Sequence, residues 1–254
     1  LKSETPHEFG GQLIWQTPQA FEEALNSWAS VADITFQAVD DSASEVGTIR
    51  AAFSSAVGDY WGWAYYPYSN AAAGDIWVNP NFVEDSWERG EYNFEATLHE
   101  IGHALGLEHP HENNLLSSDL DNNNYTIMSY TDYEKSLYPE AGYINGDYVW
   151  MSYYIRPETP MILDIAAIQE IYGANYSFND GNTTYTIDNS KPFFKTLWDG
   201  GGRDTIDASG FETTCTINLN EGEYSSFYFA PESDTGGATP TYDGTNALGI
   251  ALNC

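Results

Sequence analysis

The chain has 254 residues, with 38 Asp and Glu against 8 Lys and Arg, which gives a formal net charge of −30 at pH 7. The hydrophobic fraction of 42% and the aromatic fraction of 15% exclude a disordered acidic chain. A strongly anionic surface repels phosphates, so we expect neither nucleic acid nor membrane as a partner. No apolar segment reaches the ~20 residues of a transmembrane helix. We therefore expect a globular protein that acts as a monomer in solution.

The sequence contains two cysteines, Cys215 and Cys254, which do not have the CxxC spacing of a cysteine metal site. They either form one disulfide or remain two thiols, because composition does not give the redox compartment. Residues 1–6 lack the apolar run of a signal peptide, so we expect no signal peptide within this chain.

The first part of the chain predicts helices and strands in alternation. Thr17-Pro18 is typical of a helix start, and apolar residues on one face predict a helix to about Ser30. Alternating or apolar runs predict strands over 33–39, 48–53 and 74–79. From residue 92 to 107 the pattern is helical, with Gly106 near the end.

The second part begins with residues 110–158, which show little periodicity and predict a long functional loop. Thr159-Pro160 predicts the start of a helix that ends near Gly173. Strands are predicted over 183–187 and 213–219.

A change of composition near Ala174 predicts two parts, residues 1–174 and residues 175–254. The first is expected to be an α+β domain and the second a small β-rich region.

The segment from His99 to His109 has the spacing of a metal site. On a helix, His99 and His103 project from the same face one turn apart, and Glu100 is placed to accept a proton from water. Gly106 can adopt a positive φ, which turns the chain so that His109 approaches from a third direction. Three neutral imidazoles with an open fourth position predict a catalytic zinc site, and surface histidines on a helix are the alternative.

This eleven-residue pattern resembles the zinc motif of the metzincin metalloproteases. Residues 125–130 resemble the Met-turn of that family, with Met128 beneath the metal. Tyr130 matches a tyrosine that serves there as a switching metal ligand and oxyanion partner. His109-Pro110 and residues 163–175 are similar to the serralysin branch, and the likeness runs from about residue 20 to 220.

The resemblance implies a metzincin catalytic domain with a twisted mixed sheet and an active-site helix. It also implies His99, His103 and His109 as zinc ligands, Glu100 as general base and Tyr130 as stabiliser or extra zinc ligand. The implied activity is that of a secreted, extracellular zinc endopeptidase with broad specificity for proteins and peptides. The chain is then a mature form without signal or propeptide.

The resemblance further implies structural calcium in the C-terminal part. Carried over by motif, the oxygen donors are Asn179, Gly181, Thr183, Asp199, Gly201 and Asp204. An ordinary glycine-rich turn is the alternative. Residues 201–206 form one fragment like the calcium repeats of this branch, and too few residues follow for a stacked β-roll.

The predicted strand upstream of the zinc helix, Gly74-Asp75-Ile76-Trp77, is expected to edge the cleft and pair with an extended substrate. An ordinary strand without a substrate role is the alternative. Several aromatic residues either line the primed side of the cleft or pack under the loop: Tyr143, Tyr148, Trp150, Tyr153 and Tyr154. Asp164 either hydrogen-bonds near the Met-turn or faces solvent.

Three other functions are compatible with parts of the sequence. Another metzincin branch would share the chemistry but have a different cleft. A catalytically silent peptide-binding protein would keep the fold but is expected to lose the base, and Glu100 is present. A storage or structural protein has no need for an open zinc site.

Overall fold

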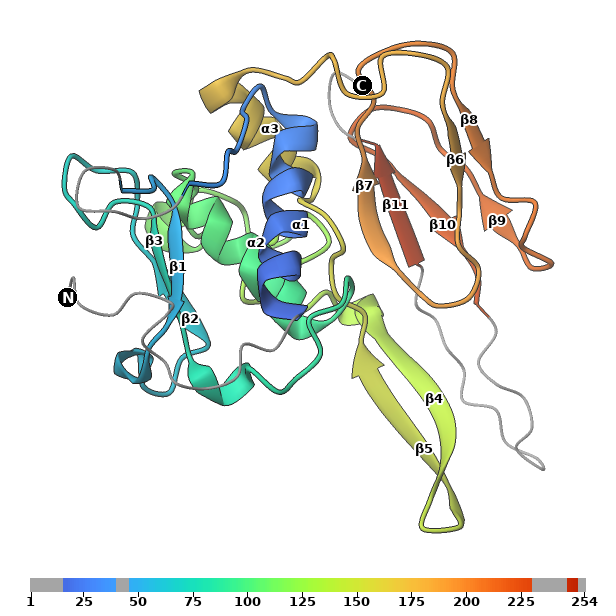
Figure 1. The fold of residues 1–254 in the computed structure, drawn as a ribbon. Coiled ribbons are helices and arrows are strands. Elements are labelled where there is room, and N and C mark those ends of the chain that lie inside the picture. Colours follow the sequence, from blue (N-terminus) through green and yellow to red (C-terminus); the bar gives the residue numbers. More distant parts are fainter. Residues whose placement is uncertain (1–15, 40–45, 230–245, 251–254) are drawn as a thin grey trace.

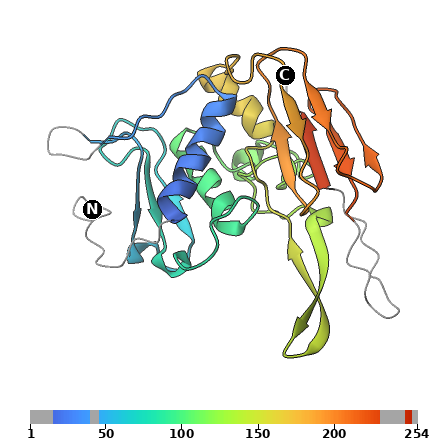
Figure 2. The same cartoon turned by 45° about the vertical axis from the view of Figure 1, so that its right-hand side comes forward.

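The computed structural model describes residues 16–39, 46–229 and 246–250. A three-stranded sheet lies on one side of helices α1 (Gln16–Val31) and α2 (Tyr92–Ala104), and the C-terminal strands lie on the other side (Figure 1). The rotated view shows the same layers and a hairpin that projects from the body (Figure 2). This arrangement confirms the expected α+β class. Among the described residues, every helix is too short or too polar to span a bilayer.

Helix α1 forms where the sequence predicts it. Trp28 on α1 is fully buried, and its Nε1 donates to the carbonyl of Leu98 on α2 at 3.2 Å. Phe21 and Leu25 pack against the same core from the predicted face of α1. The two helices therefore share one apolar core, and α2 is held from behind while its other face remains available for a site.

The N-terminal sheet has the order β1-β3-β2. Strand β1 (Arg50–Phe53) is parallel to β3 (Asp75–Val78), and β2 (Gly62–Ala64) is antiparallel to it. Short 3-10 turns follow β1 at Ser55–Val57 and β3 at Pro80–Phe82. Strands β1 and β3 confirm two predictions, whereas β2, three residues long, was not predicted.

One predicted strand and one predicted helix start are wrong. Residues 33–39 form no strand, and the Asp33 N–H donates to the carbonyl of Gly173. Helix α3 (Ile162–Tyr172) begins after the predicted Thr159-Pro160 start. The Thr159 hydroxyl oxygen accepts instead from the backbone N–H of Thr196, a tertiary contact that replaces the expected helix cap.

The predicted loop over 110–158 contains two short 3-10 turns, Glu112–Asn114 and Glu134–Ser136, and a long β-hairpin. Strand β4 (Leu137–Ile144) pairs antiparallel with β5 (Asp147–Tyr154) along its whole length. Asn145 and Gly146 both have positive φ, of 53° and 92°. Asn-Gly between two aromatic-rich runs is the usual signal of such a turn, so the hairpin has a local signal in the sequence.

Within residues 175–229 and 246–250, the structure has six short strands: β6 (Thr184–Thr186), β7 (Phe194–Leu197), β8 (Thr205–Asp207), β9 (Cys215–Thr216), β10 (Tyr224–Phe227) and β11 (Asn246–Ile250). One sheet has the order β7-β11-β10-β9, and β6 pairs with β8. Both strands predicted here exist, in shorter form. Cys254 and residues 1–6 lie outside the described residues, so the expectations about the disulfide and the signal peptide stay predictions.

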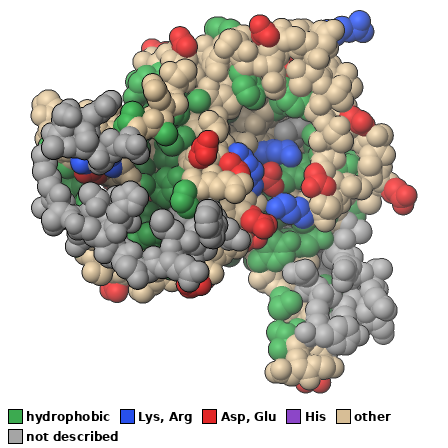
Figure 3. All heavy atoms as spheres, viewed as in Figure 1, with side chains coloured by type: hydrophobic (Ala, Val, Ile, Leu, Met, Phe, Trp, Pro, Cys, Tyr) green, Lys and Arg blue, Asp and Glu red, His purple; other side chains and the backbone are tan. Residues whose placement is uncertain are grey.

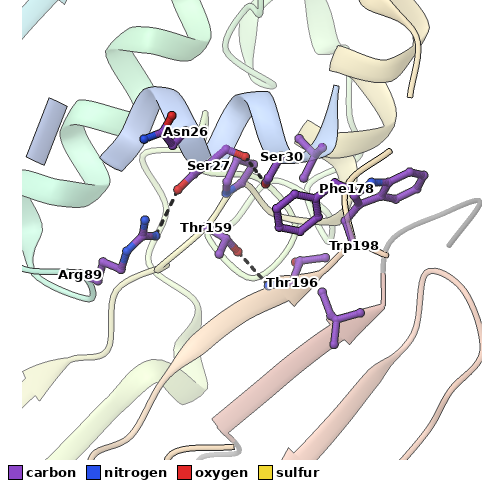
Figure 4. A pocket seen from close by; sticks show the side chains of 11 residues that line it. Asn26, Ser27, Ser30, Arg89, Thr159, Phe178, Thr196 and Trp198 are labelled. Carbon is purple, nitrogen blue, oxygen red and sulfur yellow. Dashed lines mark hydrogen bonds between the residues drawn. The ribbon is translucent and has the colours of Figure 1, made fainter. Parts of the chain in front are cut away.

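A cavity of about 350 Å³ lies between α1, the segment before α3, and β7. Ser27, Thr159 and Trp198 lie at its wall, with hydrogen bonds running between the lining groups (Figure 4). On this side of the molecule acidic side chains are scattered and several basic ones gather at a hollow (Figure 3). Beside the cavity, Lys195 of β7 has its Nζ 4.0 Å from a carboxylate oxygen of Glu158. Strand β7 is thus attached by polar contacts to the segment before α3, at Glu158 and Thr159.

Candidate active site

Three histidines bring their Nε2 atoms together at one point. His99 and His103 project from α2, and their Nε2 atoms lie 3.2 Å and 3.0 Å from Nε2 of His109. Gly106 has a φ of +107°, and this turn lets the chain double back from the helix to His109. The structure therefore brings together the three residues that the motif predicts.

Each ring is held by its other nitrogen. His99 Nδ1 donates to the carbonyl of Ile127 at 2.8 Å, and His103 Nδ1 donates to that of Leu107 at 2.7 Å. His109 Nδ1 lies 2.9 Å from a carboxylate oxygen of Glu112. Because carbonyl and carboxylate oxygens only accept, Nδ1 carries the proton, and the lone pair of each Nε2 faces the shared point.

This donor set fits zinc. Tetrahedral zinc–nitrogen distances of ~2.0–2.1 Å place ligand nitrogens about 3.3 Å apart, close to the separations found here. Burial lowers the pKa of His99 to about 3 and that of His103 to about 4. Both rings are thus neutral at physiological pH, the form that binds a metal.

Glu100 lies beside the cluster, between α2 and β2. Its Oε1 is 3.8 Å from the position that a Cβ on Gly62 would take, and its carboxylate accepts from the backbone N–H of Ala64. Among the described residues, nothing hydrogen-bonds its Oε2, although the atom is buried. Burial raises the pKa of Glu100 to about 8. Such a carboxylate can take up and give back a proton.

Tyr130 lies at the opening of the site. Its hydroxyl is 2.6 Å from His109 Nε2, and its ring stacks on His99 with centroids 5.4 Å apart. The side chain is 70% exposed, so a molecule that enters the site can reach the hydroxyl. Tyr130 therefore lies next to the predicted zinc ligands, where the family resemblance places it.

Met128 and the turn that carries it lie beneath the histidines. Met128 is buried, and Asp164 on α3 holds the turn by accepting from the Thr126 hydroxyl at 2.6 Å and from the Ile127 N–H at 2.8 Å. Ile127 in turn accepts from His99. Of the two roles that the sequence left open for Asp164, the structure shows the partner of the Met-turn.

Three residues near the site were not predicted to take part. Glu112 orients His109, His111 stacks on His109 with centroids 5.1 Å apart, and the Tyr66 ring meets His103 at 5.3 Å. Tyr66 comes from the loop between β2 and β3, so only the folded chain brings it here. His111 and Glu112 directly follow the motif, and their nearness to His109 was the available signal.

The expected substrate strand is wrong in one respect. Strand β3, which contains most of Gly74-Asp75-Ile76-Trp77, is the middle strand and is paired on both sides. Its backbone groups are already used, so an extended peptide cannot add to it. Among the described residues, β2 pairs with β3 alone and has its other edge open.

The residues predicted to bind calcium lie in two turns that pack tightly. A Cβ on Gly202 would be 2.5 Å from the carbonyl oxygen of Gly181, so the turns approach within backbone contact. Asp204 Oδ1 accepts from the Thr183 N–H at 2.9 Å across the same junction.

The remaining calcium candidates adjoin this junction. Asp199 accepts from the Gly201 N–H at 2.8 Å and from the Tyr185 hydroxyl at 2.5 Å. Asn179 donates to that same hydroxyl at 3.0 Å. The structure thus brings the six candidates into one region and adds Tyr185, a residue that the sequence analysis did not include.

Two protein-family models match the chain. The model described as Matrixin matches residues 13–134, and the one described as Peptidase M10 serralysin C terminal matches residues 163–229. The first matched range contains the histidine motif and Tyr130, and the second contains α3 from its second residue onward and the predicted calcium turns.

Several known proteins are similar to this chain. Serralysin B of Dickeya chrysanthemi is 34% identical over 256 residues, which covers 88% of this chain and 50% of that protein. Serralysin A of the same organism is 37% identical over 80% of this chain and 45% of its own length. Serralysin of Photorhabdus sp. (strain Az29) is 33% identical over 80% of this chain and 44% of its own. The chain thus spans about half the length of these relatives. By these similarities, and with its histidine cluster, the chain belongs to the serralysin family of metzincin metalloproteases.

Proposed function

We propose that this chain is a zinc-dependent endopeptidase that hydrolyses peptide bonds of proteins by general-base catalysis. The observation that supports this most is the position of Glu100, a buried carboxylate with an unused oxygen next to three convergent Nε2 atoms. A site that only binds peptides has no use for a buried proton acceptor there, because a buried carboxylate oxygen without a hydrogen-bond partner costs stability.

In the proposed mechanism, His99, His103 and His109 hold the metal through Nε2. Bound zinc supplies Lewis acidity at the scissile carbonyl. Glu100 takes a proton from the attacking water at Oε2 and passes it to the leaving amine nitrogen. Tyr130 donates a hydrogen bond from its hydroxyl to the oxyanion that develops on the carbonyl oxygen.

We infer that the substrate binds as an extended strand along the open edge of β2. This edge runs beside Glu100, since the Ala64 N–H donates to its carboxylate and a Cβ on Gly62 would lie 3.8 Å from its Oε1. Strand pairing uses backbone groups that every residue has, which supports broad specificity. Preferences for particular substrate side chains then arise from residues beside this edge. Tyr66, whose ring contacts His103, is one of them.

We further propose that residues 175–254 form a distinct β-rich region with a structural calcium site at Asn179, Gly181, Thr183, Asp199, Gly201 and Asp204. Support comes from the close approach of the two turns and from their mixture of carboxylate and backbone oxygens. A calcium chelator should then lower the melting temperature even after zinc is restored, and Asp204→Asn should remove this effect. An unchanged melting temperature would argue for an ordinary turn.

Membership of the serralysin family supports secretion and action on protein substrates outside the cell. These properties, and action as a monomer, are part of this proposal. An acidic protein is also expected to tolerate salt, because counter-ions screen repulsion among its 30 excess negative charges.

The test is cleavage of an unfolded protein before zinc removal, after removal by a chelator, and after zinc is restored. Loss followed by recovery supports a zinc endopeptidase. A protein that binds one zinc per chain and cleaves nothing would favour the silent peptide-binding alternative.

A further inference from the structure

A buried carboxylate on the active-site helix takes no part in the proposed chemistry. Glu95 lies in the first turn of α2, one helical turn before His99, and is 6% exposed. Its Oε2 is 3.3 Å from Nη1 of Arg156, and its Oε1 accepts a hydrogen bond from Asn123. A charge in such a place is costly unless it is paired, so this network has a substantial effect on the fold around it.

Arg156 connects the helix to a second carboxylate. The same Nη1 atom lies 2.5 Å from Oδ1 of Asp132, so one nitrogen bridges Glu95 and Asp132. The guanidinium also lies 5.5 Å from the ring centroids of Tyr92 and Tyr154, which limits its movement. Arg156 lies two residues after the end of β5, at the base of the hairpin.

Asp132 belongs to the segment that carries Tyr130, two residues earlier. On the other side of the same segment, the Asn123 N–H donates to the carbonyl of Thr131 at 3.0 Å. Glu95 therefore reaches the residues next to Tyr130 by two routes, through Arg156 to Asp132 and through Asn123 to Thr131.

Tyr130 depends on this backbone for its position. The ring contacts described for it are with His99, His109 and the exposed His111, and its side chain is 70% exposed. Apart from these ring contacts and the contact of its hydroxyl with His109 Nε2 at 2.6 Å, the position of Tyr130 depends on the backbone that carries it. Small displacements of a catalytic group lower the rate strongly.

We propose that Arg156, with Glu95 and Asp132, is a clamp that positions the Tyr130 hydroxyl relative to the zinc helix. The inference rests on the proposed function, because it assigns a role to Tyr130 in catalysis. These three are positioning residues that act through Tyr130 and do not themselves touch the substrate.

The test is a double-mutant cycle of Arg156→Met with Tyr130→Phe, using cleavage of an unfolded protein. Arg156→Met should lower kcat about tenfold with little change in KM when Tyr130 is present. In the Tyr130→Phe background the same substitution should lower kcat less than twofold, because nothing remains to be positioned. Arg156→Lys should recover most of the loss, since one nitrogen bridges both carboxylates.

Arg89→Met provides the matched control. Arg89 also packs on α2, with its guanidinium 4.7 Å from the Phe94 ring, and it bonds the Ser27 hydroxyl and the Glu158 carbonyl. It makes no described contact with the Tyr130 segment. Its loss should lower the melting temperature as Arg156→Met does, and any effect on kcat should be equal in both backgrounds. An equal loss for Arg156→Met in both backgrounds, or no loss, would overturn the proposal.

Hydrogen exchange of the zinc-free protein gives a readout that does not need activity. Peptides that cover residues 123–133 should exchange at least fivefold faster in Arg156→Met than in wild type or Arg89→Met. Unchanged exchange refutes the clamp even in an active enzyme. If wild type cleaves nothing but exchange rises as expected, the proposed function fails and the clamp on this segment stands, without its catalytic role.

Discussion

Met128 Sδ occupies the space beside Gly102 so closely that a Cβ on that glycine would lie 2.7 Å from the sulfur. On its other side the same Cβ would lie 3.3 Å from Cζ2 of the buried Trp28. Gly102 is one residue before the second histidine of the motif, so the Met-turn touches the helix at the level of the metal ligands. A side chain at position 102 would push the turn away from the site.

Gly102→Ala is accordingly expected to destabilise the protein, by about 1–3 kcal/mol, as overpacking of a core does. The gain in helix propensity from Ala does not offset this fully, since it is about 1 kcal/mol. Urea unfolding and zinc affinity should both be measured, and zinc should bind more weakly. A stabilised variant with wild-type zinc affinity would mean that the contact is not tight.

Glu100→Gln should reduce kcat at least 10³-fold while zinc remains bound one per chain. The amide keeps the shape of the carboxylate but cannot accept the proton from water. Glu108→Gln, at an exposed position just before His109, is the control and should retain activity. Zinc content by metal analysis separates loss of the base from loss of the metal. An active Glu100→Gln protein would refute the assignment.

Asp164→Ala should lower the free energy of unfolding by more than ~3 kcal/mol, because three buried donors lose their acceptor at about 1–3 kcal/mol each. These donors are the Thr126 hydroxyl and the N–H groups of Ile127 and Met161. Asp164→Asn should cost only about 1 kcal/mol, because its amide oxygen still accepts from both N–H groups. Denaturation of the zinc-free proteins measures both. Equal costs would show that the charge, and not the hydrogen bonds, matters.

Stability should depend on pH through Glu95. Burial raises the pKa of Glu95 from 4.5 to about 7, so the folded state holds this proton more tightly than the unfolded state does. The contribution of Glu95 to the free energy of unfolding is therefore largest at low pH. It is lost as the pH rises through about 7. The loss is at most about 3 kcal/mol, at 1.36 kcal/mol for each pKa unit.

Glu95→Gln has no such proton to release, so the stability of wild type relative to this variant should fall between pH 4.5 and 8. Urea unfolding of the zinc-free proteins at several pH values in this range gives the difference directly. A difference that rises with pH would mean that Arg156 outweighs burial at this carboxylate.

The sequence predicted the elements whose signals are local. His99 and His103 are four positions apart, which predicts that they share one face of helix α2. Gly106 indicates the turn to His109. The hairpin β4–β5 also has a local signal, Asn145-Gly146. The aromatic residues around this turn do not give a clear alternation of apolar and polar positions, so the two strands were not predicted. The start of α3 was misplaced because Thr159 bonds to β7, a partner far along the chain.

The sequence by itself determined the proposed metal ligands, the proposed base, Met128 and Tyr130, because a short motif on a helix and a turn fixes residue type and spacing together. Only the tertiary structure decided which strand has an open edge, since strand order depends on pairing between distant segments, and β2 took the place expected for β3. The tertiary structure also decided that Arg156 contacts both Glu95 and Asp132. These residues are 61 and 24 positions apart from it in the chain, and no local pattern connects charges that meet only after the hairpin and the zinc helix have packed.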